Sequence, residues 1–230
     1  MQDLSLTVRL AARALARANL VHAYGHCSAR IDTKRFLVCP PEPMGLIAPG
    51  AVCVEVPVEG PLPEGVLGEV RLHQQIYRRR PEAKGVVRFM GPNAMALGAA
   101  STVPAMRHGF GTYFAPKVGL WNDVQLIRDD ARAEGAVDAM GVSAGLLMRG
   151  NGAVTAGASL EEATVLAWYL EDMCRVELAA RMAGLADAPV IAPEAAAERA
   201  TRAGRIVERM WDYLTAADPE KAPQEKGSAT

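Results

Sequence analysis

Residues 68–93 constrain the fold more than any other segment, because they join a helix to a buried strand through a short connection. Apolar side chains recur at helical spacing over residues 69–80, and Pro81 ends that helix because its ring cannot donate the next backbone hydrogen bond. The apolar run at 86–90 then predicts a strand, and the Gly-Pro pair after it predicts a turn. This pattern indicates a mixed α/β domain.

Helices and short strands also alternate on both sides of this segment. Ser159 and Glu162 form a capping-box pattern that predicts the start of the longest helix. We predict helices over residues 4–18, 69–80, 93–100, 160–183 and 194–214, with one or two more within 122–140. We predict strands over residues 25–31, 35–39, 52–58, 86–90, 144–150 and 152–157, and an irregular segment over 101–122.

Length and composition favour one domain with a substantial core. The chain has 230 residues, of which 50% are hydrophobic, so we predict a single domain over residues 1–215. Residues 216–230 lack bulky apolar side chains, and we predict a disordered tail there. The net charge of −1 gives no electrostatic footprint for nucleic acid or for an anionic membrane. Apolar positions between Arg9, Arg13 and Arg17 favour an ordinary amphipathic helix over a transit peptide.

The cysteines and apolar runs bear on the compartment. The four cysteines show neither metal-ligand spacing nor the density of a secreted scaffold, so we predict reduced thiols. No apolar run is long enough to span a bilayer. We therefore expect a cytoplasmic protein that binds neither membranes nor nucleic acid.

Arg88 is the residue that fits its surroundings least, because it lies in the middle of the apolar strand pattern "VVRFM". A buried guanidinium without a partner is costly. Arg88 either binds an anionic substrate or stabilises a developing enolate, or it forms a structural ion pair with Glu69. Both interpretations remain open from the sequence.

Three motifs in order, "GHCSAR", "GEVRLHQQIYRRRPEAKGVV" and "LLMRGNGAVTAGASLEEATVLAWYLE", resemble the class II aldolase/adducin family over residues 5–182. The resemblance implies a three-layer α/β/α fold with a central mixed, mostly antiparallel sheet. It also implies a catalytic glutamate at Glu69 and three histidines that hold a divalent metal. Those three histidine positions are occupied here by Arg88, Met90 and Asn151.

None of these three side chains replaces a neutral imidazole as a ligand. Arginine stays cationic, methionine is a soft donor, and one asparagine carbonyl holds a hard ion poorly. We therefore predict no metal at this position and no cofactor. The resemblance suggests instead that Arg88 carries the positive charge and Glu69 moves protons as the catalytic pair.

Further candidate residues come from the same motifs and from the irregular segment. Gly25 with His26 resembles the family branch that contains decarboxylases of hydroxylated aromatic acids, although His26 equally fits a backbone-bonding role. Asn151 suits either a substrate hydrogen bond or a left-handed turn. The predicted substrate-binding residues are His26, Arg30, Asn151, His108 and Tyr113. The last two are expected to act across a subunit boundary, or else to serve packing.

The substrate and the assembly follow from the same resemblance. The family's serine-rich phosphate cradle is replaced by "CPPEPMG" and "VLGE". We therefore expect the substrate to be a small non-phosphorylated carboxylate, a class that includes aromatic acids. We predict a metal-independent lyase of decarboxylase or retro-aldol type. The alternatives are a non-catalytic adducin-like binding or assembly module, and an isomerase or hydratase. The family's cyclic tetramers imply a homo-oligomer.

Overall fold

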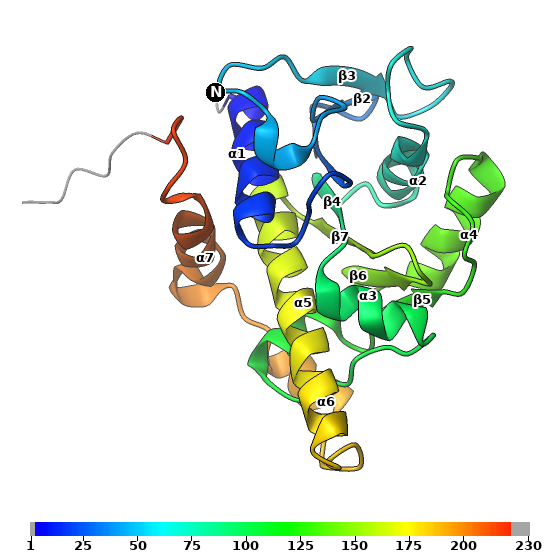
Figure 1. Cartoon of the computed structure of the whole chain (residues 1–230), viewed down its shortest axis with the longest axis vertical. Coiled ribbons are helices and arrows are strands. Elements are labelled where there is room, and N and C mark those ends of the chain that lie inside the picture. Colours follow the sequence, from blue (N-terminus) through cyan, green and yellow to red (C-terminus); the bar gives the residue numbers. More distant parts are fainter. Residues whose placement is uncertain (1–2, 222–230) are drawn as a thin grey trace, which may run out of the picture.

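The computed structural model describes residues 3–221 and forms one seven-stranded sheet with helices on both faces (Figure 1). The strands are β1 His26–Arg30, β2 Arg35–Val38, β3 Val54–Pro57, β4 Gly85–Phe89, β5 Gly119–Trp121, β6 Gly145–Met148 and β7 Ala153–Gly157. Their order is β3-β2-β1-β4-β7-β6-β5, and only β5 and β6 pair in parallel. The predicted fold class, with a mixed and mostly antiparallel sheet, is confirmed.

Side-chain caps mark the starts of the main helices. Asp3 accepts hydrogen bonds from the first-turn amides of Ser5 and Leu6, and Ser159 accepts one from the amide of Glu162. The carboxylate of Glu162 accepts from the amide of Ala158, one residue before the position of a standard capping box. The α-helices are α1 Leu4–Arg17, α2 Arg71–Arg79, α3 Pro92–Ala99, α4 Asp130–Met140, α5 Leu160–Met182, α6 Pro193–Arg199 and α7 Ile206–Thr215. The 3₁₀ turns are η1 Met44–Leu46, η2 Gly68–Val70, η3 Gly109–Phe114 and η4 Ala203–Arg205.

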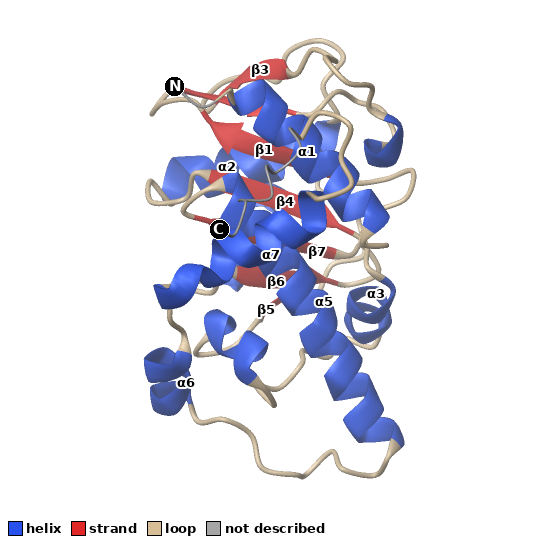
Figure 2. Cartoon of the chain, turned by 90° about the vertical axis from the view of Figure 1, so that its left-hand side faces the viewer, coloured by secondary structure: helices blue, strands red, loops and turns tan. Residues whose placement is uncertain are grey.

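The helices form two layers around the sheet. Helices α1, α5 and α7 lie on one face, which Figure 2 views directly, and α2 and α4 lie on the other. Gly85 permits the start of α5 to approach β4, because a Cβ atom there would lie 2.3 Å from the Cα atom of Leu160. Alternate side chains of β4 therefore face opposite layers, and Arg88 faces the α2 side.

Two element predictions were incomplete. The irregular segment contains the strand β5, whose three residues are too few to show an alternating pattern. The predicted last helix is divided into α6 and α7, because Gly204 and Arg205 adopt positive φ values of 71° and 55° between them. The other predicted helices and strands are present, with boundaries shifted by a few residues.

The prediction of a disordered tail from residue 216 was wrong for residues 216–221, and residues 222–230 lie outside the described residues. The Asp218 side chain is 0% exposed and accepts hydrogen bonds from Arg13 at 2.7 and 2.8 Å and from Arg17 at 3.1 Å. Glu220 bonds Arg9 and Arg13, each at 2.7 Å. The arginine stripe of α1, which consists of Arg9, Arg13 and Arg17, therefore holds residues 216–221 by buried ion pairs rather than by apolar packing.

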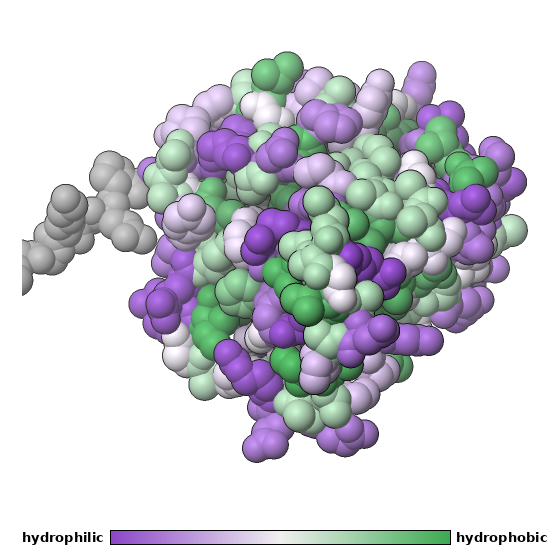
Figure 3. Space-filling view, turned by 60° about the horizontal axis from the view of Figure 1, so that its bottom comes forward, coloured by the Kyte–Doolittle hydropathy of each residue, from purple (hydrophilic) through white to green (hydrophobic). Residues whose placement is uncertain are grey.

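Surface properties bear on assembly. No helix within residues 3–221 is long and apolar enough to cross a membrane. Exposed apolar side chains near the end of α5 include Met182, Leu185 and Val190. Figure 3 views the end of the molecule at which α5 finishes, and apolar groups are interspersed there with polar ones. The homo-oligomer implied by the family stays a prediction.

Candidate active site

Arg88 lies at the centre of the sheet, near the end of β4, where neighbouring strands surround it. It pairs in register with His26 on β1 and with Val154 on β7. Directly opposite residues of an antiparallel pair place their side chains on the same face, so His26 and Arg88 lie side by side. Arg88 is 6% exposed, and the strand pattern that suggested a buried guanidinium was therefore correct.

Asn151 holds the guanidinium of Arg88. The Arg88 Nη2 atom donates to the Asn151 side-chain Oδ1 at 2.5 Å and to its backbone oxygen at 3.1 Å. Asn151 lies in the turn between β6 and β7, flanked by Gly150 and Gly152, which have positive φ values of 65° and 78°. A Cβ atom on Gly152 would lie 2.1 Å from the Phe89 backbone oxygen, so only glycine allows this turn to pack against β4. Two of the three positions at which the family resemblance implies histidine ligands thus bond each other.

Arg88 and Glu69 do not form the direct pair that the structural interpretation of Arg88 required. Within residues 3–221, the Glu69 carboxylate forms its ion pair with Arg128, at 3.1 Å. Burial lowers the pKa of Arg88 to about 10, and the nearby charge of Glu69 opposes that shift only in part. The guanidinium therefore remains cationic at neutral pH with an incomplete set of partners.

A cavity of about 280 Å³ opens in front of these residues. Its walls include Gly25, His26, Pro41, Glu69, Arg88 and Arg128. Glu69 lies in η2, just before α2, and Arg128 lies just before α4, so both reach the cavity from the α2 side of the sheet. The cavity is open and lined with charged and polar groups, and this favours an enzyme over a closed site kept only for assembly.

A buried hydrogen-bond network leads from the cavity wall into the α2 layer. His26 Nδ1 lies 2.8 Å from His73 Nε2, and His73 Nδ1 lies 2.6 Å from Ser28 Oγ. The Ser28 hydroxyl lies 2.9 Å from the Tyr77 hydroxyl, which donates to the Ser28 backbone oxygen at 2.9 Å. His73, Ser28 and Tyr77 were missed as site residues from the sequence. The spacing of His73 and Tyr77, four residues apart on one helix face, was the available signal.

Burial keeps both histidines of this network neutral. Desolvation lowers the pKa of His73 to about 3 and that of His26 well below its usual value, and the charge of Arg88 lowers both further. An imidazole held neutral in this way acts as a hydrogen-bonding group and not as a fixed cation.

We expect the free energy of unfolding to fall as the pH falls below about 6.5, because the unfolded chain then binds protons that His26 and His73 cannot bind in the folded state. The stabilisation is fully present above pH 6.5; His73 contributes a slope of about 1.4 kcal/mol per pH unit down to about pH 3, and His26 adds a slope of the same sign. Urea unfolding at pH 7.5, 6.0 and 5.0 measures the slope. The His73→Asn variant should show a shallower slope. The exposed His22→Asn control should keep that of the wild type.

The donor set at the three family ligand positions does not fit a divalent metal. Arg88 places a cation there, and it already occupies the amide oxygen of Asn151, while Met90 offers only a thioether. Within residues 3–221, no group of three or more histidine, cysteine, aspartate or glutamate residues could hold a metal ion.

The three remaining candidate residues lie outside the lining of this cavity. The Arg30 guanidinium donates to the backbone oxygens of Tyr77, Arg80 and Ala83, which is a structural role. His108 lies 3.7 Å from Asp172 and contacts the ring of Phe110. Within one chain, Arg30 and His108 therefore do not join Arg88 and Glu69 at the cavity.

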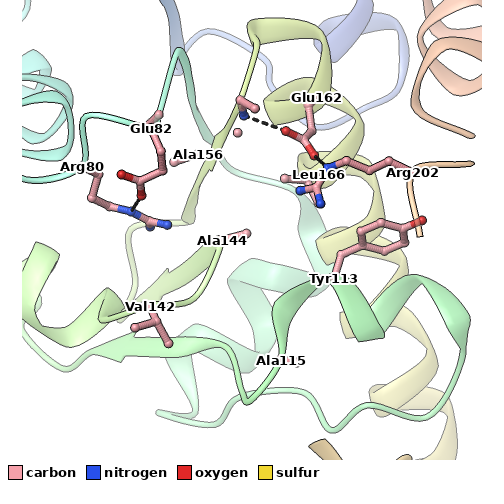
Figure 4. A pocket seen from close by; sticks show the side chains of 13 residues that line it. Arg80, Glu82, Tyr113, Ala115, Val142, Ala144, Ala156, Glu162, Leu166 and Arg202 are labelled. Carbon is pink, nitrogen blue, oxygen red and sulfur yellow. Dashed lines mark hydrogen bonds and ion pairs between the residues drawn. The ribbon is translucent and has the colours of Figure 1, made fainter. Parts of the chain in front are cut away.

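Tyr113 lines a second cavity of about 250 Å³, between an Arg80–Glu82 ion pair and an Arg202–Glu162 ion pair (Figure 4). This cavity lies at the start of β4 and the end of β7, whereas Arg88 lies near the end of β4. The two sites are therefore at opposite ends of these strands. The Tyr113 hydroxyl donates to the Thr201 backbone oxygen at 2.5 Å. Its role at a subunit boundary stays a prediction.

Comparisons with known proteins agree with this fold. The family model described as Class II Aldolase and Adducin N-terminal domain matches residues 7–178. The crystal structure of an aldolase II superfamily protein from Pseudomonas syringae superposes with a TM-score of 0.76 at 22% identity, over 94% of this chain and 93% of that one. L-fuculose-1-phosphate aldolase from Thermus thermophilus gives a TM-score of 0.69 at 25% identity, over 79% of this chain and 95% of that one.

Curated relatives carry a decarboxylase name. A 3,4-dihydroxyphthalate decarboxylase from Terrabacter sp. (strain DBF63) is 31% identical over 75% of this chain and 79% of its own length. The protein of the same name from Arthrobacter keyseri is 30% identical over 77% and 78%. Together with the family match, these relatives support a lyase-type enzyme. The chain therefore belongs to the class II aldolase and adducin family.

Proposed function

We propose that this protein is a metal-independent decarboxylase of a hydroxylated aromatic carboxylate. The observation that carries the proposal is the Arg88 guanidinium, held by Asn151 in the wall of an open cavity where other family members are expected to hold a metal. A fixed, partly desolvated cation can stabilise negative charge on a substrate oxygen without a metal ion.

The cavity wall supports a non-phosphorylated acid. Pro41, Glu42 and Pro43 line the side on which the family's phosphate cradle is expected. Prolines offer no backbone N–H to a phosphate, and the Glu42 carboxylate repels one. Leu67 and Tyr24 add apolar surface to the same cavity, which suits an aromatic ring. The names of the two curated relatives, both 3,4-dihydroxyphthalate decarboxylases, support this class of substrate.

Each charged residue has a part in this chemistry. Arg88 donates to a negatively charged oxygen of the substrate, and Asn151 fixes the orientation of its guanidinium. Glu69, which forms an ion pair with Arg128 in the wall of the same cavity, relays the proton between solvent and the ring carbon. The C–C bond to the carboxylate then breaks, its electron pair restores the aromatic ring, and carbon dioxide leaves.

We expect purified protein treated with a chelator to release carbon dioxide from 3,4-dihydroxyphthalate and to form a dihydroxybenzoate. Added Mn²⁺ or Zn²⁺ should change kcat/KM by less than about twofold, because no donor set at Arg88 would bind the ion. Chromatography of the products and elemental analysis of the same sample measure both quantities. Strict dependence on an added metal would contradict metal independence. Turnover of phosphorylated sugars in place of aromatic acids would contradict the proposed substrate class.

A further inference from the structure

One nitrogen in the cavity wall has no partner, although every other polar atom of the buried network behind it has one. His26 is 3% exposed, and its Nε2 atom is buried and forms no hydrogen bond within the described residues. His26 lines the cavity beside Arg88, whose backbone pairs with it in register. An orphaned buried nitrogen is costly unless a ligand completes its hydrogen bonding.

The network behind His26 determines which nitrogen carries the proton. The Ser28 backbone oxygen can only accept, so the Tyr77 hydroxyl must donate to it. The Tyr77 oxygen is then free to accept the Ser28 hydroxyl hydrogen, and Ser28 Oγ must in turn accept from His73 Nδ1. With its proton on Nδ1, His73 presents a bare Nε2, which accepts from His26 Nδ1. His26 Nε2 is left without a hydrogen.

This network ends inside the protein without reaching a proton acceptor, so it orients the His26 imidazole and does not conduct protons. Its last acceptor is a backbone carbonyl, which takes up no proton at neutral pH. Tyr77 is buried, and desolvation raises the pKa of its hydroxyl, so Tyr77 does not release a proton either. The hydrogen-bond directions are therefore set from the Tyr77 end, and Nε2 is always the bare nitrogen of His26, a residue that lines the cavity.

We propose that His26 Nε2 is the hydrogen-bond acceptor for a substrate hydroxyl that lies next to the anionic group bound by Arg88. This inference rests on the proposed function and adds a requirement to it. Because His26 and Arg88 are cross-strand neighbours on one face, they match two vicinal oxygen groups on an aromatic ring, one donating and one accepting. His73, Ser28 and Tyr77 are positioning residues that act through His26.

The acceptor has a defined place in the reaction. The phenolic hydroxyl donates a hydrogen bond to His26 Nε2, and the polarised oxygen raises the electron density on the adjacent ring carbon. That carbon forms a C–H bond with a proton that comes from solvent through Glu69. The C–C bond to the carboxylate breaks, its electron pair returns to the ring, and carbon dioxide leaves. The phenolic hydrogen stays on its oxygen throughout, so one solvent proton is consumed per carbon dioxide released.

Nitrogen-15 NMR of the full chain at neutral pH tests the hydrogen arrangement without any ligand or turnover. The expected spectrum shows His26 and His73 each with a protonated Nδ1 and a bare Nε2. In the Ser28→Ala variant, His73 loses its Nδ1 acceptor, and both tautomers should appear at His26. A protonated Nε2 on His26 in the wild type would overturn the proposal, and this result requires no variant to fold.

Calorimetric binding of two matched probes tests selection for the hydroxyl. We expect wild-type protein to bind 2-hydroxybenzoate at least about tenfold more tightly than 2-fluorobenzoate, because fluorine cannot donate to His26. Ser28→Ala should reduce this ratio to below about threefold, and Ser28→Thr, which keeps a hydroxyl, should restore it. Thr164→Ala removes a buried hydroxyl on α5 and should leave the ratio unchanged.

The outcomes separate this inference from the proposed function. Equal affinity of the wild type for both probes, or failure of 2-hydroxybenzoate to bind, would overturn the role of His26. A bare Nε2 with selective binding, but no carbon dioxide from any hydroxylated acid, would leave the acceptor site in place and contradict the decarboxylase. The two results come from separate samples and separate instruments.

Discussion

We expect the Arg88→Met variant to lose about 10²–10³-fold in kcat/KM for a hydroxylated aromatic acid while its free energy of unfolding changes by less than about 2 kcal/mol. The loss of activity follows because methionine has no charge and no donor for the substrate oxygen. The small change in stability follows because Arg88 is desolvated and lacks a directly bonded carboxylate, so an apolar side chain suits the site nearly as well. Steady-state kinetics and urea unfolding measure the two quantities.

Arg30→Met is the matched control, because it removes a second partly buried guanidinium from the same face of the sheet. Arg30 bonds three backbone oxygens, so its loss should lower the free energy of unfolding by about 3 kcal/mol while kcat/KM of the folded fraction stays within about threefold. If Arg88→Met were instead the destabilised variant, by about 3–5 kcal/mol, Arg88 would be a structural residue and the proposed electrophile would be wrong.

The second large effect concerns residues 216–221, which follow α7. We expect Asp218→Ala to lower the free energy of unfolding by about 3 kcal/mol, because it removes two hydrogen bonds from the buried Arg13 and leaves Glu220 as its one carboxylate partner among the described residues. Arg17 loses a partner as well, although it is more exposed. Urea unfolding at pH 7.5 measures the change, and kcat/KM should not move while the protein is folded.

Asp187→Ala provides the charge-matched control, because it removes one carboxylate from an exposed position. That variant should stay within about 0.5 kcal/mol of the wild type. If Asp218→Ala behaved in the same way, the ion-pair cluster would contribute nothing measurable. Residues 216–221 would then behave as the disordered tail that composition alone predicted.

The fold and the central residues of the site were predictable from the sequence, for physical reasons. Helical spacing and short apolar runs depend on local burial, so most elements were predictable within a few residues. Arg88 was conspicuous because a charge interrupts an apolar strand, and the motif order connected it with Glu69 and Asn151. A cluster assembled from β4, η2 and the turn before β7 is visible in sequence only through such a resemblance.

Other features depend on contacts between distant segments. Ser28 and His73 meet only because β1 faces α2, and neither residue is unusual in its local context. Asp218 looks like a tail residue until the arginine stripe of α1 is placed beside it. Strand β5 has three residues and pairs in parallel with β6, so no hairpin signal marks it. Tertiary contact, rather than local propensity, determines each of these features.

A crystal structure of the protein crystallised with both 3,4-dihydroxybenzoate and Mn²⁺ tests most directly whether the Arg88 guanidinium takes the place of the metal ion. We expect a ligand oxygen within hydrogen-bond distance of Arg88 and no ion among Arg88, Met90 and Asn151. A manganese ion coordinated at that position, or a ligand held by Arg128 alone with Arg88 turned out of the cavity, would contradict it.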